Sequence, residues 1–237
     1  MKRILLPLLL LVSIFSQGQG LLKKASGLLN KAKGGSLSTE EIVAGLKEAL
    51  SVGANNSSSK LSAVDGFFAN AAIKVLLPPE AQKVERALRT AGMGKLVDDA
   101  ILSMNRAAED AAKSAAPIFL DAIKGMSFQD AMGILRGSDT AATGYLRSKT
   151  VPALTAAFRP VIEGALEKTN ATKHWKTLFE TYNKLPTTFN KVNPDLAGYV
   201  TDRGLSGLFH QVADEEMQIR KNPAARVTET LKKVFGS

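Results

Sequence analysis

Apolar residues recur at helical spacing along most of the chain after residue 38, and this pattern predicts one helix after another. The first helix is expected to begin with a capping box formed by Ser38 and Glu41 and to end at Gly53. The next begins at Pro79, because proline is favoured in a first helical turn, and Gly92 closes it.

A longer helix is expected from about Lys95, and alanines along one side of it favour close packing. Pro117 has no backbone N–H to donate, so it must kink this helix or divide it before Gly125. Ser127 then begins a short helix that is expected to end at Gly137.

Residues 133–144 read GILRGSDTAATG, and this glycine-spaced stretch with one acidic residue could be a catalytic loop or a helix boundary. As a boundary, it places Gly137 as a left-handed C-cap and Ser138 as the N-cap of the next helix. Asp139 then lies in the first turn, where the helix dipole favours a negative charge. This interpretation accounts for every residue but does not exclude a site.

The second half of the chain continues the helical pattern. An apolar stripe over residues 154–166 crosses Pro160, which is expected to kink that helix without ending it. The Asn-Pro pairs at 193–194 and 222–223 each predict a cap followed by the first residue of a helix. The most aromatic face is expected to belong to the core, and it consists of Trp175, Leu178, Phe179 and Tyr182.

Only residues 73–77 alternate as a strand would, and one isolated extended segment cannot make a sheet. This segment is therefore expected to be a strap between helices. The predicted fold class is all-α, with about nine or ten mostly short helices in one compact domain over residues 38–237.

The first twenty residues have the features of a secretory signal peptide. Lys2 and Arg3 precede an apolar run of about twelve residues, and a small, polar exit follows. That run is shorter than the roughly twenty residues that a membrane-spanning helix needs. The chain has no cysteine, which excludes lipid attachment at a cysteine, disulfides and Cys-based metal sites. We expect a periplasmic protein that is not a lipoprotein.

Residues 21–37 are expected to form a basic, amphipathic tether that could lie on an anionic membrane surface. Removal of residues 1–20 takes away two basic residues and no acidic one, so the formal net charge falls from +9 to +7. A basic excess can favour nucleic acid, anionic lipid or an acidic polymer. Nucleic acid is not expected, because the chain is exported and has no basic run interleaved with aromatic residues.

Several segments resemble the bacterial family called DUF4197. They are MNRAAEDAA at 104–112, the segment from PIFLDAIKGM to YLRSKT at 117–150, and LFHQVADEEMQIRKNPAARVTETLKKVFG at 208–236. GLKEAL at 45–50, DGFFAN at 65–70 and IKVLLP at 73–78 extend the resemblance to nearly all of the mature chain. The family is a domain of unknown function, so the resemblance implies an exported helical protein and transfers no catalytic residues.

The motifs of common enzyme classes are absent from the sequence. There is no zinc-protease, nucleophile-elbow, Walker A or Rossmann pattern. Ser57 to Lys60 fit the S-x-x-K of penicillin-binding enzymes, with partial echoes of their other two motifs at 138–140 and 149–151. That chemistry needs its K-T-G on a strand, whereas both echoes fall in one predicted helix and its cap.

No metal site or cofactor is expected. His174 and His210 are the only histidines, and His210 with Asp214 at i, i+4 could offer two metal ligands on one helical face. Two ligands do not make a site, so a helical charge pair is the simpler interpretation. Glu216 faces Arg220 at i+4, which predicts either a surface pair or part of a buried network.

The candidate polar cluster lies in the alanine-rich helix, where Asn105, Arg106 and Glu109 can form a local network. If that helix is packed on several sides, these charges require partners from neighbouring helices. An internal network that fixes helix packing is the simpler interpretation, and a ligand carboxylate or phosphate is the alternative. The candidate partners from neighbouring helices are Asp130, Arg136 and Asp139. Of these, Asp139 in particular is expected to close a network with Arg106.

Two functions follow from these observations. The favoured one is a non-enzymatic exported protein that binds an envelope protein, an anionic membrane surface or a small ligand through its helical faces. The alternative is a hydrolase-type enzyme that uses Glu109, Asp130 and Asp139 in a helical cleft, which requires two of these carboxylates to lie within about ten ångströms of each other.

Overall fold

A computed structural model gives the fold of the chain. The chain divides into two compact units, Met1–Ser38 and Thr39–Ser237. The residues that the structure describes are 38–169, 171–172, 175–176, 180, 191, 195–222, 224 and 232.

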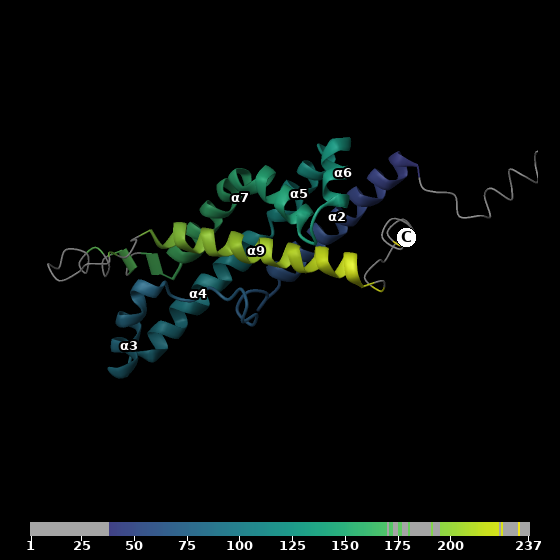
Figure 1. Ribbon diagram of the computed structural model, residues 1–237. Helices are drawn as coiled ribbons and strands as arrows, with labels where there is room; N and C mark the ends of the chain where they lie inside the picture. The colour runs from purple at the N-terminus through teal and green to yellow at the C-terminus, as the bar shows by residue number, and fades with distance from the viewer. Residues whose placement is uncertain are drawn as a thin grey trace, which may run out of the picture. The chain divides into compact units, whose positions relative to one another are not determined.

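The described residues form seven α-helices and one short 3-10 helix, with no strand among them, so the predicted all-α class is confirmed (Figure 1). They are fewer and longer than the nine or ten short helices expected, since four have 19 residues or more. In chain order they are α2 (Thr39–Ser62), η1 (Pro79–Ala81), α3 (Gln82–Thr90), α4 (Gly94–Ala112), α5 (Ala115–Lys124), α6 (Phe128–Arg136), α7 (Ala141–Glu167) and α9 (Leu196–Lys221).

One expected helix break lies inside a continuous helix. Gly53 does not end the first helix, because it is buried and faces Glu215 and Ile219 of α9, and helix α2 continues to Ser62. Burial against a neighbouring helix outweighs the low helix propensity of one glycine, which is worth about 1 kcal/mol. Helix α7 likewise continues through Pro160, as expected.

Other helix ends agree with the sequence pattern. Pro79 opens η1, which leads directly into α3, and Gly92 follows α3 in the left-handed conformation with φ of 80°. The predicted division before Gly125 is also found, because α4 stops at Ala112 and α5 starts at Ala115 with Pro117 in its first turn.

The predicted boundary at GSDT is wrong in its details. Gly137 has φ of −81° and ψ of −173°, so it is extended and not a left-handed cap. Helix α7 begins only at Ala141, and its N-cap, Thr140, makes no side-chain capping bond. Ser138 is therefore not the N-cap, and Asp139 precedes the helix instead of lying in its first turn. Glu216, a side chain from helix α9, caps α7 instead.

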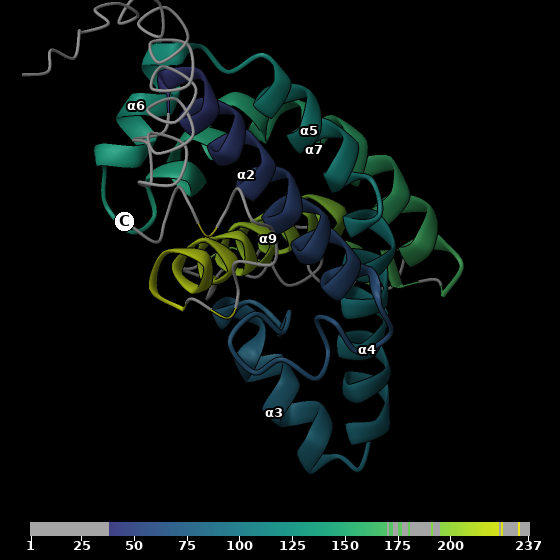
Figure 2. The same ribbon diagram turned by 90° about the vertical axis from the view of Figure 1, so that its right-hand side faces the viewer.

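The core lies where α4, α7 and α9 pack together, and α2 packs across α9, α5 and α4 (Figure 2). Small residues allow this close approach: Ala108 of α4 faces Gly204 of α9, and a Cβ on that glycine would lie 3.7 Å from the alanine Cβ. Phe119 of α5 and Phe209 of α9 meet edge to face, with ring centroids 5.8 Å apart. Both rings are almost fully buried.

Residues 63–78 connect α2 to η1 without forming a strand, which confirms the expected strap. The strap is nevertheless anchored in the core, because Phe67, Ile73 and Val75 are buried. It packs against α9 at Gly207, where a Cβ would lie 2.6 Å from a ring carbon of Phe67 and 3.2 Å from the Cβ of Ile73. Only a glycine allows the strap and the helix to approach this closely.

Some expectations lie outside the described residues. These are the signal peptide and tether over residues 1–37, most of the predicted aromatic face, and the helix predicted from 222–223 onward. Trp175 of that face is described and is buried in the core, as expected. Helix α9 starts at Leu196 with Asp195 as its N-cap, slightly later than the Asn-Pro pair predicts. None of the described helices combines the length and the apolar character needed to cross a membrane.

We predict that Gly207→Ala lowers the free energy of unfolding by about 1–3 kcal/mol, because the added methyl group overpacks the contact with Phe67. Gly164→Ala is the control, since nothing lies within 4 Å of the Cβ position there. That change should stabilise helix α7 by roughly 0.5–1 kcal/mol. Urea denaturation measures both, and equal effects of the two substitutions would contradict the packing argument.

Candidate functional site

Asn105, in the middle of α4, uses its whole side-chain amide to hold the strap. Its Oδ1 accepts a hydrogen bond from the Val75 N–H at 2.9 Å, and its Nδ2 donates to the Val75 carbonyl at 2.8 Å. The same Nδ2 donates to the Ile101 carbonyl at 2.7 Å. Asn105 and Val75 are fully buried, so water cannot reach the backbone of Val75. The side chain of Asn105 supplies the hydrogen bonds that this backbone would otherwise lack.

Glu109 lies one turn further along α4 and holds the beginning of the strap. Its Oε1 accepts hydrogen bonds from the backbone N–H groups of Phe67, at 3.1 Å, and Phe68, at 3.2 Å. Its Oε2 accepts from the Arg106 guanidinium at 2.6 Å. The glutamate is only 4% exposed, so its charge is balanced by one cation and two peptide dipoles in a water-poor environment.

Arg106 lies at the solvent edge of this network and also binds Asp65 of the strap, at 2.7 Å. Asp65 has φ of 68°, a left-handed conformation that aspartate adopts more readily than most residues. Hydrogen bonds to Glu109 and then to Asp65 raise the pKa of Arg106 above its usual value. The ring of Phe68 lies beside two cations, because its centroid is 3.7 Å from the Lys74 ammonium and 5.7 Å from the guanidinium carbon of Arg106.

The predicted cluster is only half assembled. Asn105, Arg106 and Glu109 act together on α4, whereas Arg136 is exposed at the C-terminal end of α6. Asp130 is half-buried and forms a capping box with Ser127, whose N–H and Oγ donate to the same carboxylate oxygen at 3.0 and 2.7 Å. The hydroxyl bond and then the backbone bond to Ser127 hold the pKa of Asp130 below its usual value.

Asp139 does not close a network with Arg106. It is half exposed and pairs with Lys221, the last residue of α9. The hydrogen bond from Lys221 lowers the pKa of Asp139 below its usual value. The expectation of a buried pair with Arg106 is therefore wrong, because the loop between α6 and α7 lies beside the end of α9.

A second buried carboxylate, Glu216 of α9, caps helix α7 from outside. It accepts hydrogen bonds from the N–H groups of Ala142, at 3.0 Å, and Thr143, at 2.9 Å, and from the Thr143 hydroxyl at 2.9 Å. These N–H groups belong to the first turn of α7 and have no partner within their own helix. A negative charge there also interacts favourably with the helix dipole.

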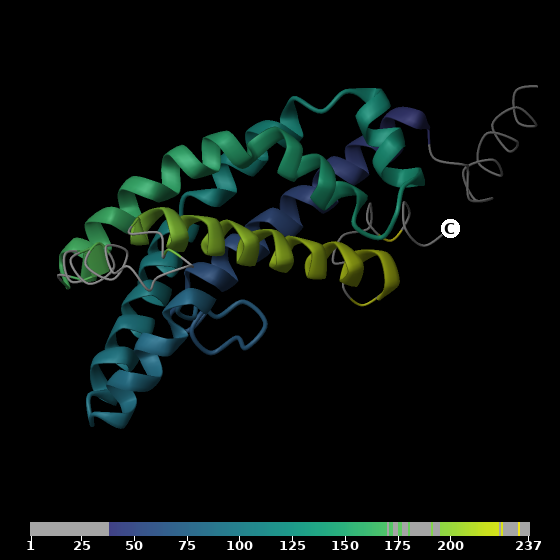
Figure 3. The same cartoon turned by 60° about the vertical axis from the view of Figure 1, so that its left-hand side comes forward.

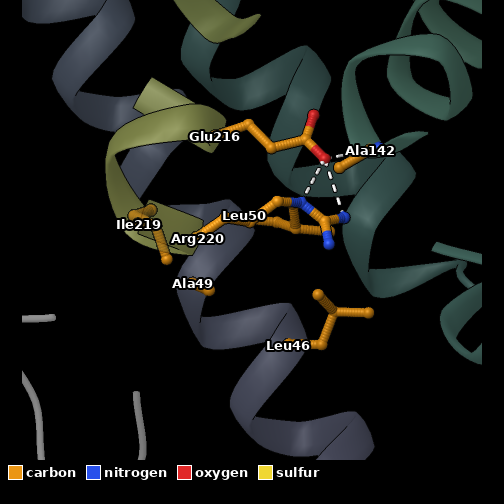
Figure 4. Close-up of a pocket in the computed structure, with 7 residues that line it drawn as sticks. All are labelled: Leu46, Ala49, Leu50, Ala142, Glu216, Ile219 and Arg220. Atoms are coloured by element: carbon orange, nitrogen blue, oxygen red, sulfur yellow. Dashed lines mark hydrogen bonds and ion pairs between the residues drawn. The ribbon is translucent and has the colours of Figure 1, made fainter. Parts of the chain in front are cut away.

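Arg220, one turn after Glu216 on the same helix, completes this network (Figure 4). Its Nε and Nη2 donate to one oxygen of Glu216 at 3.0 and 2.9 Å, and its Nη2 also donates to the Ile134 carbonyl at 2.9 Å. The two side chains are 14% and 6% exposed. The i, i+4 spacing of Glu216 and Arg220 predicts either a surface pair or part of a buried network, and the structure shows a buried network. This network joins α9 to both α6 and α7.

A pocket borders the Glu216 network and is otherwise apolar. Its volume of about 20 Å³ accommodates about one water molecule, far less than the roughly 300 Å³ at which sites for small organic ligands begin. Figure 4 shows the side chains that line it, which are Leu46, Ala49, Leu50, Ala142, Glu216, Ile219 and Arg220.

The remaining candidates offer little chemistry. His210 and Asp214 form an exposed pair at 3.3 Å on α9, and the described residues contain no group of three or more side chains placed to hold a metal ion. Ser57, which would be the nucleophile of the S-x-x-K echo, is fully buried in α2. Thr150 of the K-T-G echo lies on α7 and donates its hydroxyl to the Leu146 carbonyl.

We predict that Glu109→Gln lowers the free energy of unfolding by about 3 kcal/mol, because it removes a buried charge that balances Arg106 and places an amide donor against another donor. Asp139→Asn is the control, since its partner Lys221 is exposed and solvent screens the pair. That variant should unfold at nearly the wild-type urea concentration. Equal losses in both variants would contradict the distinction between a buried and a surface carboxylate.

Glu216→Gln is likewise predicted to cost about 3 kcal/mol, because the neutral amide leaves Arg220 short of a partner. Glu215→Gln on the adjacent position is the matched control and should cost much less, because Glu215 accepts only side-chain bonds from Asn56 and Gln211. Amide hydrogen exchange should show faster exchange of Ala142 and Thr143 only in Glu216→Gln. Unchanged exchange at these amides would contradict the external cap.

The comparisons with known proteins agree with the resemblance noted in the sequence. Searches of curated proteins and of solved structures found no match to the chain. The model of one family, described as a protein of unknown function (DUF4197), matches residues 36–236. This match covers nearly the entire chain, so the protein belongs to the DUF4197 family.

Proposed function

We propose that the protein is exported to the periplasm and serves there as a non-enzymatic binding or interaction module. The proposed location depends on the first twenty residues, where two basic residues precede an apolar run too short to span a bilayer. The absence of cysteine is compatible with an oxidising compartment but does not require one.

The observation that carries the binding role is how the buried carboxylates are used. Each oxygen of Glu109 and of Glu216 accepts at least one hydrogen bond from the chain itself, chiefly from backbone N–H groups and a neighbouring arginine. A general acid or base must lie within hydrogen-bond reach of a substrate proton. Carboxylates enclosed by their own chain are placed for structural work.

The enzyme alternative requires Glu109, Asp130 and Asp139 to share a cleft. Glu109 is directed to the strap, Asp130 caps its own helix, and Asp139 pairs with Lys221. Their partners lie on different elements, and this separation favours a binding role over acid and base catalysis. The pocket beside Glu216 is also too small for a metabolite, so an extended surface is a better binding site than a cavity.

Localisation is tested on protein isolated from its native host after osmotic shock. The mature chain should appear in the periplasmic fraction, with a mass that corresponds to a start at residue 19 or 21. Protein with an intact Met1 in the cytosol would overturn the proposed export.

The binding role is tested by assaying the purified protein on esterase, phosphatase, glycosidase and peptidase substrates. Turnover by the wild type should equal that of a folded Asp130→Asn, Asp139→Asn double variant, because these acids have structural or surface partners. An activity that the two substitutions abolish would favour the enzyme alternative.

A further inference from the structure

Helix α7 has an inner side in the core and an outer side that faces solvent. Leu146, Leu154 and Phe158 are buried on the inner side, where α4, α5 and α9 pack. In Figures 1 and 3, α7 runs along one edge of the helices. The outer face of α7 consists of six residues that are exposed or half-buried and lie within about 60° of Ala156 around the helix axis: Lys149, Pro152, Ala153, Ala156, Pro160 and Glu163.

The centre of the outer face is uncharged and carries only short side chains. Pro152, Ala153, Ala156 and Pro160 are all exposed there. Side chains this short let the axis of a second helix approach to about 8 Å. They do not by themselves identify the partner, which has to be inferred from the charges at the two ends of the face.

Charges of opposite sign flank this centre at equal distances. Lys149 lies seven residues before Ala156, and Glu163 lies seven residues after it. Among the residues that the structure describes, Lys149 has no ion-pair partner, and its ammonium lies 5.7 Å from the ring centroid of Tyr145. Glu163 binds Arg159 through one of its oxygens, Oε1, at 2.8 Å, so its other oxygen can accept a second cation. The two ends of the outer face are therefore able to bind each other's charge.

This arrangement is complementary to itself when one copy is reversed. A two-fold axis beside Ala156 relates two copies whose α7 helices run antiparallel and meet through the same surface. Lys149 of each copy then lies level with Glu163 of the other, which gives two equivalent charge pairs. Arg159 is already balanced by Glu163 and Asp195 of its own chain. Parallel helices would instead place each charge against its like, so the charges favour the antiparallel pair.

We propose that the protein forms a weak, two-fold symmetric dimer through the outer face of α7. A partner of another kind would not require charges placed symmetrically about Ala156, so a second copy of this chain fits the face best. This inference rests on the proposed binding function and names its partner. The outer face has fewer residues than the roughly 20–30 that a stable interface uses on each side, so the dimer is reversible.

Sedimentation equilibrium of the protein as its host produces it tests self-association. The weight-average mass should rise from that of a monomer toward that of a dimer over concentrations from about 1 µM to 1 mM. Ala156→Glu should weaken this association at least about tenfold, because it places two like charges against each other at the axis. Val161→Glu is the control, since Val161 is exposed on another side of the same helix. A mass that stays at that of the monomer over the whole range would overturn the proposal.

Exchange of the charges tests the pairing. Lys149→Glu and Glu163→Lys should each weaken self-association about tenfold, because each change turns two attractive pairs per dimer into repulsive ones. An equimolar mixture of the two variants should associate about as tightly as the wild type, since both pairs then join opposite charges. Lys83→Glu is the control, because it makes the same change of charge on α3, which packs on α4 and η1. A mixture that associates no better than either variant alone would overturn the proposal.

The antiparallel direction is tested with introduced disulfides, because the chain has no cysteine of its own. Pro152 and Pro160 lie four residues on either side of Ala156, so the two positions meet across the proposed axis. A mixture of Pro152→Cys and Pro160→Cys should therefore cross-link on mild oxidation, which requires Cα atoms within about 7 Å. Neither variant alone should do so, because equal positions lie about 12 Å apart along the helix axis. Cross-links within one variant and none between the two would overturn the proposal.

These experiments separate failure of this inference from failure of the proposed function. A chain that stays monomeric and whose turnover does not depend on Asp130 and Asp139 would overturn the dimer and retain the proposed binding role. An enzymatic activity that depends on Asp130 and Asp139 would overturn the proposed function, whatever the sedimentation experiment shows.

Discussion

The fold depends on satisfying backbone N–H groups that the strap and the first turn of a helix leave without partners. The strap is a non-helical segment anchored in the core, and the first turn of α7 lies beside the core. Both therefore contain backbone N–H groups that water does not reach. An unsatisfied buried N–H costs about 1–3 kcal/mol. Glu109 and Glu216 each accept two such N–H groups, and an arginine on the same helix balances each charge.

This solution also specifies which segments lie together. Glu109 joins residues 41 and 42 positions apart in the sequence, and Glu216 joins α9 to residues 73 and 74 positions earlier. Apolar contacts alone tolerate a shift between helices, whereas a carboxylate bound to two particular amides does not. Glu109 thus fixes the strap on α4 and Glu216 fixes α9 on α7, and the glycines Gly204 and Gly207 let α9 pack closely on α4 and on the strap.

Much of the fold could be predicted from the sequence because its signals are local. The helical period, the Ser127 capping box and the first-turn position of Pro79 depend on residues within one or two turns of each other. The break expected at Gly53 failed because burial against α9, which is distant in sequence, overrides local propensity. The cap expected from Ser138 failed for the same reason, since Glu216 supplies it from 73 and 74 residues away.

The same difference between contacts that are local and contacts that are distant in sequence applies to the candidate site. Arg106 and Glu109 are three residues apart on one helix, so the sequence predicts their contact, but Asp65 is a partner that only the path of the strap reveals. The sequence predicts Asp139 in a buried network because it follows a glycine between two helices whose charges need partners, whereas the end of α9 supplies its partner on the surface. The polar residues that the pattern marks as candidates for chemistry thus mostly fix the backbone. Several large apolar side chains nevertheless remain exposed, among them Met93 and Leu96, so function is better sought on the surface than in the interior.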